Sequence, residues 1–285
     1  MEIQLVRHAT LVVRLGGRTL LIDPMLGDLG EFRSFLIDKS EEPTCNYNPI
    51  ARLSDDPGLS SILASVEAIF VTHAQHRDHF DLDLFEQHLK QEAPGTDLLK
   101  AIDRLKALPV FCQPLGEGQQ QSDEDWLRDH DFSSVQSVED KHQYDGIKVF
   151  RTDGKHGPNN ELGPVSGFVL RAENEPTLYI AGDTIWCPEV AVALEMHKPE
   201  VVVVNAGAAQ MYATPPAITM TKKDVAKVCK HMPSATVVAV HMEAIDHCLL
   251  RRKELEDFIE GEGLRGQVRI PADGESMKFR GRHLL

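Results

Sequence analysis

The residues between His73 and Asp81 are of the types that bind metal ions. His73, His76 and His79 lie close together, and Asp78 directly precedes the last of them. Neutral imidazoles and carboxylates are good ligands for zinc and related divalent cations. The cluster directly follows an apolar, β-branched segment that predicts a buried strand, and such a strand end is a rigid support for a site. The sequence therefore predicts a metal site at this point.

Three further candidate ligands lie at remote points of the chain. His156, Asp183 and His241 each come just after an alternating or apolar segment that is typical of a strand. A sheet can bring such strand ends to one edge, so we expect these side chains to meet the His73–Asp81 cluster. His247 competes with His241, but it lies further from the end of its strand.

Strand and helix patterns occur in both halves of the chain. We expect strands over residues 11–15, 19–22, 68–72, 109–112, 147–150, 167–171, 177–181, 201–204, 236–240 and 268–279. Helical periodicity is found near residues 84–89, 98–105, 126–131, 188–196, 221–231 and 249–261. No linker divides the chain, so we predict one α/β domain over residues 1–285 with two sheets and outer helices.

Composition and charge limit the class of protein. The formal net charge of −14 repels phosphate backbones and anionic membranes, which argues against nucleic-acid and membrane partners. The first residues lack a basic segment followed by an apolar block, so we expect no secretory signal and a cytoplasmic location. The five cysteines are scattered and form no CxxC, as expected for reduced thiols. A small-molecule substrate is the expected partner, and a homo-oligomer is compatible with the sequence.

These motifs together resemble the metallo-β-lactamase superfamily, and most of all its lactonase-type and phosphodiesterase-type hydrolases. The segments Arg7–Val13 and Leu21–Pro24 are similar to that branch's first hairpin, which is also like the hairpin of phospholipase D-like members that act on N-acylethanolamine phospholipids. The resemblance extends from His8 to His241 and implies a four-layer αββα sandwich. It also implies that His8 and Asp23 lie beside the metals.

The resemblance also implies a ligand set. The family signature is His-x-His-x-Asp-His, followed by a distant His, an Asp and a final His. One metal is then bound by His73, His76 and His156, and a second by Asp78, His79 and His241, with Asp183 bridging both. Asp78 and His8 are the candidate catalytic residues.

The sequence departs from this signature between His73 and His76. Two residues, Ala74 and Gln75, stand where the family has one. A bulge at these residues would keep both imidazoles aimed at the metal. Alternatively, Ala74 takes the first ligand position and the first metal is weak or missing. The ligands of the second metal are unaffected in either case.

The predicted reaction is metal-assisted hydrolysis with one or two divalent cations, zinc or manganese first. A metal-activated hydroxide would attack a small ester, lactone or phosphodiester, because a divalent cation lowers the pKa of bound water from about 15.7 towards about 7. Asp78 would orient the nucleophile or accept its proton. The long loop from Gly27 to Ser60 would contribute to substrate choice. The alternative is a catalytically weak member that binds a metal or ligand as a sensor or scaffold.

Overall fold

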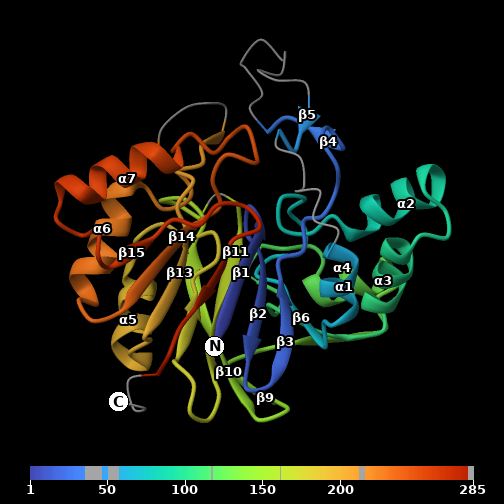
Figure 1. The fold of residues 1–285 in the computed structure, drawn as a ribbon, viewed down its shortest axis with the longest axis horizontal. Coiled ribbons are helices and arrows are strands. Elements are labelled where there is room, and N and C mark those ends of the chain that lie inside the picture. The colour runs from blue at the N-terminus through green and yellow to red at the C-terminus, as the bar shows by residue number, and fades with distance from the viewer. Residues whose placement is uncertain (36–46, 51–57, 117, 161, 212–215, 282–285) are drawn as a thin grey trace.

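The computed structural model describes residues 1–35, 47–50, 58–116, 118–160, 162–211 and 216–281. Two seven-stranded sheets face each other, and helices cover the outer face of each (Figure 1). The helices α5–α7 lie on one side of the strands and α1–α4 on the other (Figure 1). The order of layers is therefore αββα, as the sequence predicts.

The first sheet has the strand order β16-β1-β2-β3-β6-β7-β8. The antiparallel part comprises β1 (Glu2–Arg7), β2 (Thr10–Leu15), β3 (Arg18–Ile22) and β16 (Ser276–Lys278). The parallel part continues from β3 through β6 (Ala68–Phe70), β7 (Pro109–Cys112) and β8 (Ser134–Ser137). Residues 16 and 17 form the tight turn between β2 and β3, where Leu15 pairs with Arg18.

The second sheet repeats this plan with the order β15-β14-β13-β12-β11-β10-β9. Its antiparallel strands are β9 (Lys141–Tyr144), β10 (Ile147–Lys155), β11 (Pro164–Arg171) and β12 (Leu178–Ile180). Its parallel strands are β13 (Val201–Asn205), β14 (Thr236–Val240) and β15 (Val268–Arg269), which follow β12 in that order.

Each sheet is covered by helices from its own half of the chain. The helices of the first half are α1 (Leu59–Ala64), α2 (Leu82–Glu92), α3 (Asp97–Leu105) and α4 (Asp123–Asp129). The helices of the second half are α5 (Pro188–His197), α6 (Lys222–His231) and α7 (Arg252–Gly261). The helix α6 begins with a capping box, in which Thr221 and Asp224 bond each other's backbone N–H groups.

Side-chain alternation explains how the four layers pack. In β2, Leu11 and Val13 point into the core between the sheets, whereas Val12 points into the core under α1–α4. In β13, Val201 and Val203 face the other sheet, and the intervening valines pack against α5–α7. Because both faces of β13 are covered, its first four residues are all valine.

The structure corrects the sequence prediction in two places. The expected closing strand over residues 268–279 is two strands, β15 and β16, which belong to different sheets. The chain turns between them at residues 271–274, where a proline and a glycine interrupt the strand pattern. The polar strands β8 and β9 were not predicted, because edge strands carry alternating polar residues rather than an apolar run.

The structure describes part of the long loop that the sequence predicts after β3. Within the predicted loop from Gly27 to Ser60, β4 (Phe32–Arg33) and β5 (Tyr47–Asn48) form a small two-stranded sheet, while residues 36–46 and 51–57 lie outside the described part.

Four of the five cysteines lie in the described part, where they are buried free thiols: Cys112, Cys187, Cys229 and Cys248. Cys45 is not among the described residues. In the part of the chain that the structure describes, no helix has the length and hydropathy needed to cross a bilayer.

Candidate metal centre

The predicted ligands meet at one end of the two facing sheets. His73 follows β6, and His241 directly follows β14. His156 directly follows β10, and Asp183 comes after β12. These residues come from both sheets, so the site depends on how the two halves of the chain pack together.

Asp183 lies at the centre of the cluster. Its Oδ1 is 3.3 Å from the Nε2 atoms of both His79 and His241. Its Oδ2 is 3.5 Å from His156 Nε2 and 3.9 Å from His73 Nε2. One carboxylate therefore faces both sets of histidines, which is the arrangement expected of a bridging ligand.

The ligand atoms form two groups on either side of this carboxylate. We call His73, His76 and His156 the first group, and Asp78, His79 and His241 the second group. One ligand atom from each first-group residue lies within 4.8 Å of the others, and the same holds for the second group together with His8. Since zinc–nitrogen and zinc–oxygen bonds are about 2.0–2.2 Å long, donors on one ion lie about 3–4.4 Å apart. A small contraction of each group around a cation satisfies this spacing.

Buried nitrogens without hydrogen-bond partners support the same conclusion. His73 Nε2 and both ring nitrogens of His8 are buried and have no hydrogen-bond partner in the described part of the chain. A buried polar atom in this state is destabilising unless something binds it. The residues therefore fit a divalent cation by donor type, spacing and unmet bonding capacity.

Hydrogen bonds behind the ligands orient the imidazole rings. His79 Nδ1 donates to Asp23 Oδ2 over 3.0 Å, and His156 Nδ1 donates to the Ile218 carbonyl over 3.1 Å. The Thr72 hydroxyl donates to Asp23 and accepts from His73 Nδ1 over 2.9 Å. With Nδ1 occupied, Nε2 is the atom that each ring presents to the centre, as is usual for metal-binding histidines.

The extra residue in the motif is accommodated by a turn. Ala74 and Gln75 form this turn beyond the end of β6, rather than a bulge within a strand. Asp123 fixes the turn, because its carboxylate accepts from Ala74 N over 2.8 Å and from Gln75 Nε2 over 3.0 Å. The rings of His73 and His76 remain together, with centroids 4.4 Å apart. The added residue therefore does not separate the first group.

Burial and charge set the protonation states of the ligands. Burial lowers the pKa of His73 well below its usual value and that of His156 to about 4. Burial raises the pKa of Asp183, but His241 and His79 outweigh this effect and place it well below the usual value. Burial likewise lowers the pKa of His79, but Asp183 and Asp23 raise it well above the usual value. Apart from His79, these groups have the protonation states that metal binding requires at neutral pH.

Left-handed backbone occurs at several residues of the site. The φ angles of His8, Asp23 and His241 are 59°, 44° and 66°. Such angles are costly for residues other than glycine, and they persist where the surrounding structure imposes them. At Gly182, where φ is 69°, a Cβ atom would lie 2.8 Å from the Ser166 carbonyl oxygen. The turn that presents Asp183 therefore requires glycine.

A small pocket of about 240 Å³ opens beside the first group. Apolar side chains form much of its wall, and Asp78 and His247 also reach it. The described residues that line it are Phe35, Gln75, His76, Arg77, Asp78, His156, Leu162, Met211, Ile218 and His247. The pocket therefore gives a ligand access to the first group.

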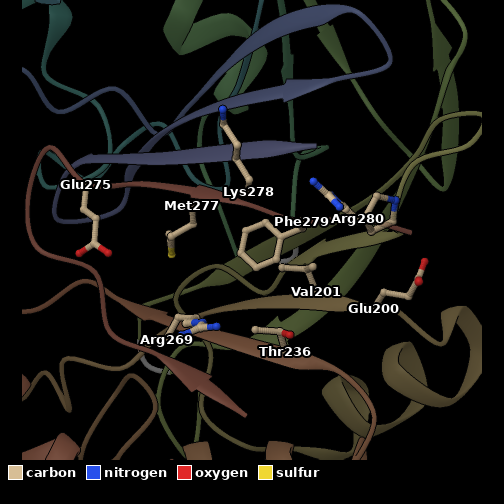
Figure 2. Close-up of a pocket in the computed structure, with 10 residues that line it drawn as sticks. Glu200, Val201, Thr236, Arg269, Glu275, Met277, Lys278, Phe279 and Arg280 are labelled. Atoms are coloured by element: carbon tan, nitrogen blue, oxygen red, sulfur yellow. The ribbon is translucent and has the colours of Figure 1, made fainter. Parts of the chain in front are cut away.

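A larger pocket of about 370 Å³ lies elsewhere (Figure 2). Val201 and Thr236 line it, and these residues begin β13 and β14, whose opposite ends lead to Asn205 and His241. The two pockets are thus at opposite ends of the same strands. Size alone does not identify the site, because only the smaller pocket contains the candidate ligands.

The sequence did not identify every residue of the site. Asn205 Nδ2 donates to Asp183 Oδ1 over 2.7 Å, and its position at the end of the apolar β13 was a usable signal. Asp123 gave no comparable signal, because only the fold brings it to Ala74. His247 was considered only as a rival of His241, yet its Nε2 lies 3.6 Å from Asp78 Oδ2. His8 lies equally close, with Nε2 3.7 Å from the same oxygen.

Comparisons with known proteins identify a family and several similar proteins. A family model described as the beta-lactamase superfamily domain matches residues 18–242. The UPF0173 protein YddR of Bacillus subtilis is 32% identical over 283 residues, which cover 98% of this chain and 100% of that protein.

Two solved structures are similar over nearly the whole chain. An isothiocyanate hydrolase from Delia radicum gut bacteria is 33% identical, with a TM-score of 0.80 and coverage of 99% of this chain and 100% of that one. A protein from Veillonella parvula, described as a possible metal-dependent hydrolase, is 28% identical with a TM-score of 0.81. That comparison covers 98% of this chain and 99% of the other.

Proposed function

Because this chain belongs to the beta-lactamase superfamily and, within it, to the UPF0173 proteins, we propose that it is a metal-dependent hydrolase of small neutral molecules. One observation carries the proposal. Two groups of metal-ligand side chains converge on Asp183, and a small, mainly apolar pocket opens beside the first group.

The ligand groups would hold one or two divalent cations, of which zinc and manganese suit the histidine and carboxylate donors. The first group would bind one cation and the second group the other, with Asp183 shared between them. Bound cations of this kind lower the pKa of coordinated water and polarise the bond under attack.

Residues of the chain would position the reactants. Asp78 belongs to the second group and also lines the pocket. Its carboxylate can therefore orient an attacking water towards a bound substrate. Burial raises the pKa of Asp78, but the nearby imidazoles of His241 and His8 hold it well below its usual value. A carboxylate of this kind is a better ligand and orienting group than a proton acceptor. His247 offers a hydrogen-bonding group on the pocket wall.

The pocket favours a neutral substrate. Phe35, Leu162 and Met211 supply apolar wall. Among the described lining residues, the single lysine or arginine is Arg77, which is paired with Asp83. Among these described residues a phosphodiester would find no free cationic side chain, whereas a small ester or lactone needs none. We therefore place a carboxylic ester or lactone ahead of a phosphodiester.

The isothiocyanate hydrolase at 33% identity favours a second candidate substrate. An isothiocyanate is small and neutral, and water attacks its central carbon. Addition of one water gives a thiocarbamic acid, which breaks its carbon–nitrogen bond to release an amine and carbonyl sulfide. The same pocket and the same polarised water would serve this reaction and ester hydrolysis.

A substrate panel tests the proposal. The purified protein, loaded separately with zinc and manganese, would be assayed with a lactone, a small ester, an isothiocyanate and a phosphodiester. Chelator-treated protein serves as the control. We expect metal-dependent turnover of at least one neutral substrate.

Two results would count against the proposal. Turnover of the phosphodiester alone would overturn the substrate class. Metal content well below one ion per chain, with no turnover, would favour the rival role of a weakly catalytic sensor or scaffold.

A further inference from the structure

His8 occupies an unusual place in the backbone. It lies in the turn between β1 and β2, where the strand pairing shifts between Leu5 and Arg7. Its φ of 59° is in the left-handed region, and its carbonyl accepts a hydrogen bond from His241 N over 2.9 Å. This hydrogen bond joins the turn of the first sheet to the strand end of the second sheet. The backbone therefore holds the His8 ring against the metal centre.

The ring of His8 is fully buried, but neither nitrogen has a hydrogen-bond partner among the residues that the structure describes. Its Nε2 lies 3.7 Å from Asp78 Oδ2, which is too long for a hydrogen bond. Its ring centroid lies 3.6 Å from that of His241. A structural histidine in a core normally bonds through at least one nitrogen. This ring has unmet donor and acceptor capacity directed at a cluster of ligands.

Distances place His8 among the ligand atoms rather than behind them. Its ligand atom and those of the second group all lie within 4.8 Å of one another. His241 Nε2 is 3.7 Å from Asp78 Oδ2 and 3.2 Å from His79 Nε2, so the spacing around Asp78 is the same from His8 and from His241. We propose that the His8 imidazole is itself a metal ligand and completes the second group. This inference rests on the proposed metal-dependent function.

The proposal gives the two metal positions different coordination. With Asp183, the second position would have five protein donors, one more than a closed tetrahedral zinc site holds. A metal that accepts five or six ligands, such as manganese or iron, suits this set. The first position would keep three imidazoles and the shared carboxylate, and it faces the pocket. Substrate would therefore approach the first position, while the second is held by protein.

His247 provides a matched control for His8. Both rings are buried, lack hydrogen-bond partners within the described ranges and lie within 3.7 Å of Asp78 Oδ2. Among the described residues, however, His247 belongs to none of the groups of converging ligand atoms, and it lines the pocket. Loss of either ring removes an imidazole beside Asp78, but only loss of His8 would remove a ligand.

The experiment is a titration of metal-free protein with cobalt or manganese, comparing the wild type with His8→Asn and His247→Asn. Apart from glycine, asparagine is among the residues that best tolerate the left-handed backbone found at position 8. We expect His8→Asn to lower the metal affinity of the second position by more than about 100-fold. Loss of a group that only hydrogen-bonds behind a ligand lowers affinity by roughly 10- to 100-fold. The visible spectrum of its cobalt form should also change towards lower coordination. His247→Asn should retain the wild-type affinity and spectrum.

The outcomes separate the two proposals. Equal second-site affinity and equal cobalt spectra in His8→Asn and the wild type would overturn the assignment of His8. A wild type that binds no metal would instead overturn the metal-dependent function, and the His8 assignment with it. Should His8→Asn fold poorly, His8→Phe keeps a planar ring without a nitrogen and is judged by the same two readouts.

Discussion

The two halves of the metal centre differ in access. In the first group, His76 is partly exposed, and both His76 and His156 line the pocket. In the second group, His79 and His241 are fully buried, and among the second group's side chains only Asp78 reaches the pocket. The first group therefore forms an open metal position, and the second group forms an enclosed one.

The difference indicates a division of roles. An open position can exchange water for substrate, whereas an enclosed position surrounded by protein donors holds its ion more firmly. The surrounding hydrogen bonds follow the same division. His79 is fixed by the buried carboxylate of Asp23, while the turn before His76 is fixed by Asp123, which begins α4. Substitutions at these two carboxylates should therefore act on different positions.

The largest effect is expected where the two positions meet. Asp183→Ala removes the carboxylate that faces the histidines of both groups. We expect metal content to fall at both positions and kcat/KM to drop by about 10²- to 10³-fold, the scale of losing a principal charge-stabilising group. Metal analysis and steady-state kinetics on one preparation measure both. If one position keeps full occupancy, Asp183 is not shared.

The second-largest effect tests the enclosed position alone. Asp23→Asn weakens the hydrogen bond to His79 Nδ1, which is 3.0 Å long. We expect metal affinity at the second position to fall by roughly 10- to 100-fold, with the first position unchanged. Calorimetric titration of metal-free protein resolves the two binding events. Equal weakening of both would mean that the positions are not independent.

The sequence predicted the strands that carry the site better than the edges of the sheets. The apolar runs of β12, β13 and β14 were recognised because strands covered on both faces are apolar throughout. The edge strands β8 and β9 were missed because their polar residues resemble a loop. Since ligands follow the buried strands, the predicted ligands could be placed without the edges.

Two contacts of the site could not be predicted from local sequence patterns. His73, Asp183 and His241 were predicted because each follows a recognisable strand. The approach of His8 to His241 depends on a turn of one sheet meeting a strand end of the other, and no local pattern records it. The same is true of Asp123, whose contact with Ala74 arises from the packing of α4.

A smaller effect is expected at the open position. Asp123→Asn keeps the size of the side chain but lets its carboxamide accept from only one of the two groups it now bonds, Ala74 N and Gln75 Nε2. The turn between His73 and His76 should loosen. Metal affinity at the first position should then fall by about tenfold, the lower end of the range for loss of a group that hydrogen-bonds behind a ligand. The second position should be unaffected. A loss at the second position instead would contradict the separate anchoring of the two groups.

The smallest effect is expected at the larger pocket, which tests the choice between the two cavities. Arg269 and Lys278 line that pocket at the ends of β13 and β14 that lie away from the metal centre (Figure 2). Their side chains are exposed and belong to none of the ligand groups found among the described residues. Exposed substitutions of this kind usually change free energies by no more than about 0.5 kcal/mol. Arg269→Ala and Lys278→Ala should therefore keep metal content at the wild-type level and kcat/KM within about twofold. A marked rise in KM with metal content intact would assign substrate binding to the larger pocket and remove the argument that the open metal position receives the substrate.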